Sequence, residues 1–98
     1  MAELQIDHLR GVEDGEARVV VRCLRGPVRR GARFVRIVGL SAPVDLELTG
    51  ILLYGRPSDE LPTAYTALVT LSGTGTHLLA AGDRANGWQI LQGADAAV

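Results

Sequence analysis

The sequence predicts an all-β fold: a small closed or partly open antiparallel β-barrel of six to seven short strands. Apolar side chains recur at a period near two rather than 3.6, which is typical of strands with one buried face. Twelve glycines in 98 residues supply many turns, and no amphipathic helix is evident. A barrel is favoured over a sandwich, because two small open sheets would leave four edges to protect.

Three strands are expected in the first half of the chain. Their ranges are 4–9, 17–24 and 33–38. The Asp14–Gly15 pair suits a tight hairpin turn between the first two. In the second strand Val19, Val21 and Cys23 occupy alternate positions, which predicts that they share a buried face.

Four more strands are expected in the second half. Their ranges are 44–48, 51–54, 65–72 and 88–91. In the first of these Val44, Leu46 and Leu48 alternate with Asp45 and Glu47, so one face is apolar and the other acidic.

Two segments are expected to lie outside the strands. Residues 55–64 contain Pro57 and Pro62, which would interrupt a helix, so they are expected to form a loop with at most one helical turn. Residues 93–98 are small and show no periodicity, so they are expected to be a frayed tail.

The length of the chain predicts a single domain, residues 1–98, with one core. No apolar run approaches the twenty or so residues that a membrane span requires, so no membrane association is expected. The first residues lack the basic and apolar regions of a secretory signal, which favours a cytoplasmic location. The lone Cys23 permits no internal disulfide.

Two stretches resemble the β-barrel second domain of translational GTPases such as elongation factor Tu. Residues 21–34 read Val-Arg-Cys-Leu-Arg-Gly-Pro-Val-Arg-Arg-Gly-Ala-Arg-Phe, similar to that family's strand, Gly-x-Val-x-x-Gly turn and next strand. Residues 67–73 and 79–83 look like its late strand and Gly-Asp turn. The resemblance implies a barrel of that type. The chain has no Gly-x-x-x-x-Gly-Lys-Ser/Thr phosphate loop, so no GTPase activity is expected.

Charge is strongly segregated along the chain. Residues 17–44 hold seven arginines and no acidic residue, a local charge of +7, whereas the remainder carries −8. Arg25, Arg29, Arg30 and Arg33 surround a predicted turn and could together hold phosphates or an acidic partner. The competing interpretation is pairing and solvation, with Asp45 and Glu47 facing Arg18 and Arg22 across the sheet.

Other candidate sites are weaker. Cys23 could be a nucleophile beside arginines, but its alternation with valines favours a place in the core. Residues 72–77 read Ser-Gly-Thr-Gly-Thr-His and are expected to form a plain hairpin, with Thr74, Thr76 and His77 as the hypothetical groups of a small-molecule or catalytic pocket. The two histidines are far apart, so no metal or other cofactor is expected. Trp88 is expected to fill the core.

These observations favour a non-enzymatic interaction module that binds a macromolecular partner, protein or RNA, through the arginine-rich edge or the residue 55–64 loop. The alternatives are an RNA-binding module, if the arginines prove unpaired and convergent, and a small-molecule-binding barrel. A homodimer is a further alternative, because residues 51–54 are consecutive and apolar and one side of them could be exposed.

Overall fold

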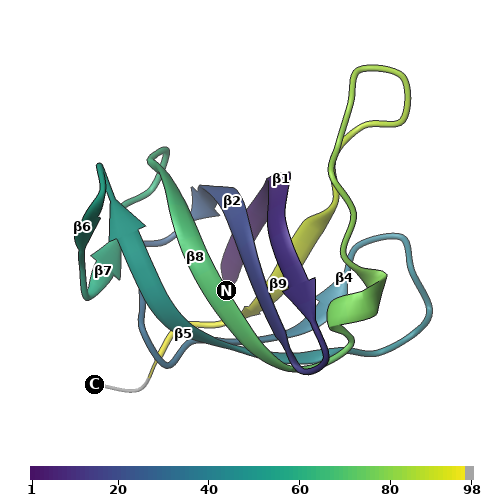
Figure 1. Cartoon of the computed structure of the whole chain (residues 1–98), viewed down its shortest axis with the longest axis horizontal. Helices are drawn as coiled ribbons and strands as arrows, with labels where there is room; N and C mark the ends of the chain where they lie inside the picture. The colour runs from purple at the N-terminus through teal and green to yellow at the C-terminus, as the bar shows by residue number, and fades with distance from the viewer. Residues whose placement is uncertain (97–98) are drawn as a thin grey trace.

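The computed structural model describes residues 1–96, which contain nine strands and one short 3₁₀ helix (Figure 1). The bounds are β1 (Ala2–Glu13), β2 (Glu16–Arg25), β3 (Val28–Arg29), β4 (Arg33–Ile37), β5 (Asp45–Leu53), β6 (Arg56–Pro57), β7 (Glu60–Leu61), β8 (Thr66–Thr74), η1 (Thr76–Leu78) and β9 (Ile90–Ala94). None of the described residues forms a helix long and apolar enough to cross a membrane.

Six strands close into an antiparallel barrel in the order β4-β9-β1-β2-β8-β5, as the sequence predicted. The ring is completed where β4 pairs with β5, with Arg33 opposite Glu47 and Phe34 opposite Leu46. The short β6 extends β5, and β3 pairs with β7 in a separate two-stranded sheet. Figure 1 shows β6 and β7 at one end of the barrel, away from the long segment that follows η1. Closure leaves the barrel strands without long free edges.

The expected alternation decides which side chains enter the barrel. In β2, Ala17, Val19, Val21 and Cys23 are completely buried, while the positions between them face outward. The buried side chains of the other strands complete one continuous apolar cluster. The core position predicted for Cys23 is therefore confirmed.

The sequence predicted two strands, 44–48 and 51–54, on either side of Gly50. In the structure they form a single strand, β5. Its pairing with β8 shifts register between Leu48 and Gly50, so Thr49 is an extra residue in a β-bulge. The hydroxyl of Thr49 lies 3.3 Å from the carbonyl oxygen of Thr70 and compensates part of the interrupted pairing. Because the bulge resets the side-chain alternation, Leu48 and Ile51 both point inward.

Residues 55–64 form no helix, but they are more ordered than the expected loop. They contain β6 and β7, and Leu61 between the two prolines is completely buried. Backbone hydrogen bonds tie the segment to the barrel, from the Ser58 N–H to the Ile51 carbonyl at 2.9 Å and from the Arg30 N–H to the Asp59 carbonyl at 3.1 Å.

The frayed tail expected from residue 93 is corrected by the structure for residues 93–96. Gly93 and Ala94 belong to β9, and Gly93 lies opposite both Ala2 of β1 and Phe34 of β4. A Cβ atom at Gly93 would lie 1.9 Å from the Arg33 carbonyl oxygen, so only glycine fits between these strands. Composition alone did not reveal this approach; residues 97–98 of the expected tail lie outside the described residues.

The hairpin expected at residues 72–77 is also corrected. The strand β8 continues to Thr74, and η1 begins at Thr76 after Gly75, whose φ of 99° lies in the left-handed region. Beyond η1 the chain forms a long arm that projects from the barrel before β9 (Figure 1).

Candidate functional site

Two arginines of the predicted cluster pair with acidic residues of neighbouring strands. Arg25 Nε lies 3.8 Å from Glu3 Oε1, across the β1–β2 pairing. Arg33 faces two carboxylates of β5, with Nη1 2.7 Å from Asp45 Oδ1 and Nη2 3.4 Å from Glu47 Oε1. These pairs are mostly solvated and contribute at most about 1 kcal/mol each. The sequence offered Asp45 and Glu47 as acids that could pair with Arg18 and Arg22 of β2, but in the structure both face Arg33.

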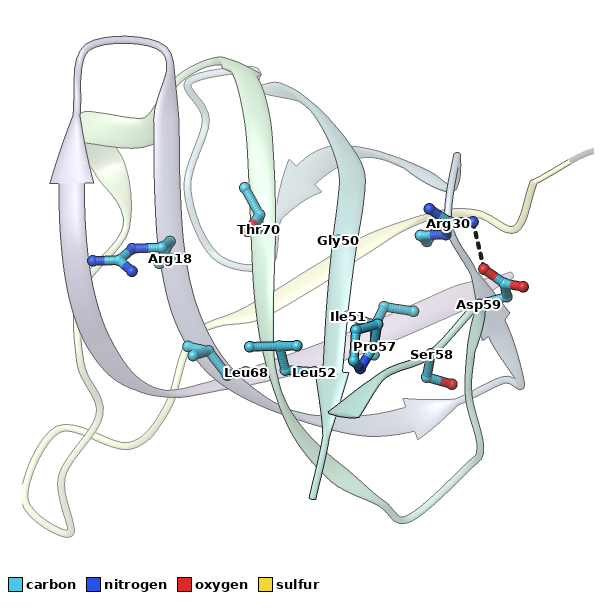
Figure 2. Close-up of a pocket in the computed structure, with 10 residues that line it drawn as sticks. All are labelled: Arg18, Arg30, Gly50, Ile51, Leu52, Pro57, Ser58, Asp59, Leu68 and Thr70. Carbon is cyan, nitrogen blue, oxygen red and sulfur yellow. Dashed lines mark ion pairs between the residues drawn. The ribbon is translucent and has the colours of Figure 1, made fainter. Parts of the chain in front are cut away.

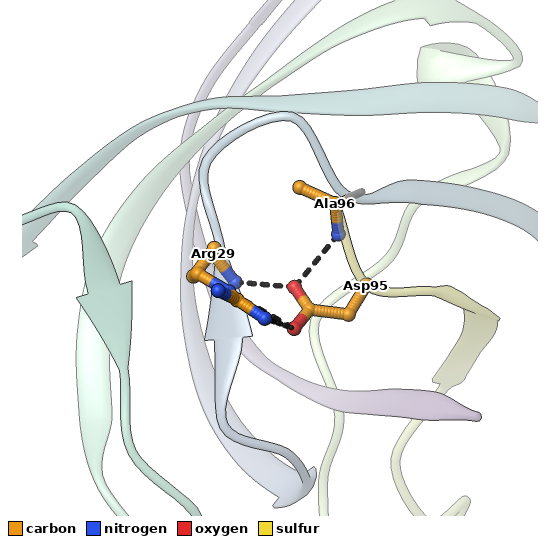
Figure 3. A network of polar contacts seen from close by, with 3 residues as sticks. All are labelled: Arg29, Asp95 and Ala96. Carbon is orange, nitrogen blue, oxygen red and sulfur yellow. Dashed lines mark hydrogen bonds and ion pairs between the residues drawn. The ribbon is translucent and has the colours of Figure 1, made fainter. Parts of the chain in front are cut away.

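Arg29 is held by a more extensive set of contacts with Asp95 (Figure 3). Asp95 Oδ1 accepts hydrogen bonds from the backbone N–H groups of Arg29 at 2.7 Å and Ala96 at 2.8 Å, and Oδ2 accepts the Arg29 guanidinium at 3.3 Å. Burial alone would raise the pKa of the Asp95 carboxyl, but these hydrogen bonds and the guanidinium charge outweigh it and lower the pKa below its usual range. The arrangement fastens the segment after β9 to β3.

Arg30, the fourth arginine, pairs with Asp59 in the segment between β6 and β7. Each of the four guanidinium groups thus faces a carboxylate from a different part of the chain. A phosphate at any of them would first meet a like charge. Each of the four arginines thus has an acidic partner, as the pairing interpretation expected, and binding of RNA or of an acidic partner through them stays a prediction.

The hypothetical catalytic groups do not form a site either. Thr76 is buried and its hydroxyl donates a 3.3 Å hydrogen bond to the Glu13 carbonyl, whereas His77 is exposed. Burial raises the pKa of the Cys23 thiol, so its reactive thiolate is disfavoured. Residues 1–96 contain no cluster of three metal-binding side chains.

A groove of about 480 Å³ opens on the outer face of β2, β8 and β5 (Figure 2). The β6–β7 segment forms one wall through Pro57, Ser58 and Asp59, and the Arg30–Asp59 ion pair lies at its end. The residue 55–64 loop that the sequence proposed as an interaction element therefore borders the groove. Of the predicted arginines, only Arg30 lines it.

One row of cross-strand neighbours on this outer face is apolar, and its members Leu68, Leu52 and Pro57 line the groove. Val20 of β2 lies opposite Leu68 of β8, Leu68 opposite Leu52 of β5, and Leu52 opposite Pro57 of β6. Leu52 is 40% exposed even though it is flanked by apolar neighbours. The opposite face of these strands lines the barrel interior and forms the core. This row is therefore a second apolar surface, on the outside of the barrel.

The adjacent row has a glycine at each end. Gly11 lies opposite Arg18, Arg18 opposite Thr70, and Thr70 opposite Gly50. The Arg18 side chain extends toward Gly11 rather than over Thr70, and its Nη2 would lie 3.7 Å from a Cβ atom at Gly11 (Figure 2). The surface above Thr70 and Gly50 is therefore left uncovered.

Gly50 is the residue of the groove that the sequence analysis missed. Its φ lies outside the left-handed region, and a Cβ atom there would meet Thr70 Oγ1 at an ordinary 3.5 Å. Neither backbone conformation nor crowding requires glycine there, and the missing side chain leaves the groove open. A glycine inside a strand-like run indicates a bulge or a close approach, and that signal was available between Leu48 and Ile51.

Trp88 was expected to fill the core, but it lies in the projecting arm and is 45% exposed. It packs on Gly82, where a Cβ atom would lie 1.9 Å from the indole Cδ1. The tip is closed by reciprocal backbone hydrogen bonds between Asp83 and Gly87, at 3.1 and 2.8 Å. The Asn86 N–H donates to the Asp83 carboxylate at 2.7 Å and helps to lower the pKa of that carboxyl.

Comparison with known proteins identifies the fold. No family model matches the sequence, and no curated protein matches it. A solved structure that does match is the translation elongation factor SelB from Methanococcus maripaludis in its apo form, with a TM-score of 0.71 and 13% identity over 92% of this chain. The chain spans 18% of that protein's length. The barrel has the fold of a translation-factor domain, as the resemblance to the second domain of translational GTPases implied.

Proposed function

We propose that this chain is a non-enzymatic binding module, and that a protein partner occupies the groove beside the β6–β7 segment. The observation that carries the proposal is the apolar row of Val20, Leu68 and Leu52 on the outside of a closed barrel. Exposure of such an apolar strip to water is unfavourable, and covering it with another apolar surface lowers the free energy. Because Gly50 has no side chain, the partner can approach the backbone of β5 closely.

The charges around the groove favour a protein over RNA. Arg30 at the groove end is already neutralised by Asp59, and Arg33, which does not line the groove, by Asp45 and Glu47. A nucleic-acid backbone carries a charge at every nucleotide and would need a longer uninterrupted basic surface. A polypeptide can place one apolar side chain in the groove without carrying a charge at every residue.

The polar groups of the groove support a binding role rather than catalysis. Asp59 forms an ion pair with Arg30, and the Ser58 hydroxyl donates a 2.8 Å hydrogen bond to the Glu60 carbonyl. The lining includes no cysteine or histidine among the described residues. Proposed catalysis would require a base and a nucleophile within hydrogen-bond reach of each other. Homodimerisation through residues 51–54 stays a prediction, for which the exposure of Leu52 and Tyr54 offers a surface.

Selection from a random peptide library displayed on phage tests the proposal. The wild-type chain is expected to enrich a set of peptides that Gly50→Leu, which fills the groove, does not retain. The matched control is Ala94→Leu, which adds apolar volume at an exposed strand position outside the groove and should retain the same peptides. Circular dichroism would verify that each variant is folded. Equal enrichment on wild type and Gly50→Leu, or none on either, contradicts the proposed function.

A further inference from the structure

We infer that the groove accepts an extended acidic peptide in which one apolar side chain stands between two carboxylates. This inference rests on the proposed function and specifies the chemistry of its partner. The features that carry it are two arginines that form no ion pair among residues 1–96, the apolar row between them and the position of the nearest acidic residues.

Arg18 and Arg22 lie on the outer face of β2, two positions on either side of Val20. Both are exposed, and neither takes part in the ion pairs formed by the residues that the structure describes. They differ in this from the four arginines discussed above. Their charges are therefore free to attract a carboxylate, and their guanidinium groups offer it paired donors.

The spacing on β2 sets the pattern that a partner should carry. Side chains at alternate positions of a strand point to one face and repeat at about 6.6 Å, so Arg18 and Arg22 are separated by about 13 Å along β2. An extended peptide beside Val20 has the same repeat. Carboxylates at its first and fifth positions would reach the two arginines when an apolar side chain at its third position lies over the apolar row.

The floor beneath that apolar side chain continues away from β2. Val20 is followed across the sheet by Leu68 and Leu52, and the groove deepens beside them because Gly50 has no side chain. Arg18 bends toward Gly11, so it borders the hollow without filling it (Figure 2). The apolar anchor and its flanking charges thus have separate places on one surface.

The next row of the sheet limits how far negative charge can extend. Beyond Arg18, Ser72 lies between Glu16 of β2 and Glu47 of β5. A phosphate backbone that continued in this direction would meet these carboxylates. The strip of positive charge is therefore short, which favours two spaced carboxylates over a nucleic acid.

The test is a titration of the ¹⁵N-labelled chain, followed by two-dimensional NMR, with the capped peptide Ser-Glu-Ser-Leu-Ser-Glu-Ser. Shifts are expected at amides of residues 18–22, 50–52 and 66–70. Matched peptides replace both glutamates by glutamine or by lysine, or the leucine by alanine. Affinity is expected to fall at least about fivefold for the glutamine peptide and further for the lysine peptide, and to weaken with salt.

Matched protein variants assign the charges. Arg18→Gln combined with Arg22→Gln should reduce affinity for the glutamate peptide at least about tenfold. Arg36→Gln removes an exposed arginine outside the groove and should change it less than about twofold. All of these positions are on the surface, so the fold should be retained, and the spectrum of each free variant verifies this.

Different failures have different meanings. Equal binding of the glutamate and glutamine peptides in the groove would overturn the acidic specificity and leave the proposed function intact. Peptide selection that does not depend on Gly50 would instead overturn the proposed function. A single-stranded RNA oligonucleotide that shifts the same amides, when the glutamate peptide shifts none, would replace both with nucleic-acid binding.

Discussion

Cys23 illustrates how the barrel controls the chemistry of a single residue. Its side chain is completely buried, and burial raises the pKa of its thiol. We expect the native chain at pH 8 to react with a thiol reagent at least about a hundredfold more slowly than the chain in denaturant, because reaction requires opening of the barrel. Absorbance with a chromogenic disulfide measures both rates, and comparable rates would contradict the enclosed position.

Asp95 links protonation to stability through its hydrogen bonds with Arg29 and Ala96. We expect Asp95→Asn to lower the free energy of unfolding at pH 7 by about 1–2 kcal/mol, because it removes a charged acceptor. Urea denaturation measures the loss. Asp95→Glu is the control that keeps the charge but displaces it.

The same substitution has a predicted pH dependence. The folded-state pKa of Asp95 lies below the ordinary 3.8, so its stabilisation is present above that pH and disappears as the pH falls through the lowered value. The difference in stability between wild type and Asp95→Asn should therefore shrink below about pH 3.8. A difference that grew on acidification would contradict the assignment.

At the scale of elements, the projecting arm has a fluorescent reporter. Trp88 is the single tryptophan of the chain and lies against Gly82. Gly82→Ala places a methyl group where the indole ring lies, so we expect a red-shifted emission and stronger quenching by acrylamide. Global stability should change by less than about 0.5 kcal/mol, because the arm lies outside the barrel. Unchanged emission would show that the ring does not depend on this contact.

Much of the element pattern was predictable because alternation is a local property. The buried faces of β2 and β8 follow directly from their side-chain order. Gly50 inside a strand-like run indicated an irregularity, but the position of the bulge at Thr49 depends on pairing with β8, and the segment was therefore interpreted as two strands. The place of β9 between β1 and β4 also depends on pairing with strands that are distant in the sequence. The small residues at 93 and 94 did not reveal this pairing.

The candidate site was predictable only in part for the same reason. The charge segregation was visible in the sequence, and so was the segment of residues 55–64 that the structure places beside the groove. The partners of the arginines were not, because Arg29 meets Asp95 from 66 positions away and Arg33 meets Asp45 across the closure of the barrel. Only the register showed that Arg18 and Arg22 remain beside an apolar row.

At the scale of the whole molecule, β9 is required for the barrel to close. We expect deletion of residues 93–98 to lower the free energy of unfolding by at least about 3 kcal/mol, because Gly93 and Ala94 pair with β1 and β4. Thermal unfolding followed by circular dichroism measures the effect. A truncated chain as stable as the full one would mean that these residues fray after all.

We propose that the hollow at Gly50 is needed for binding and not for folding, and Gly50→Ala tests the second part without knowledge of the partner. The measurement is the free energy of unfolding in urea for wild type and variant. Alanine removes backbone freedom from the unfolded state and meets Thr70 at an ordinary distance, so we expect a gain of about 0.5–1 kcal/mol. A loss of similar or greater size would show that the fold itself needs glycine there, and would contradict the claim.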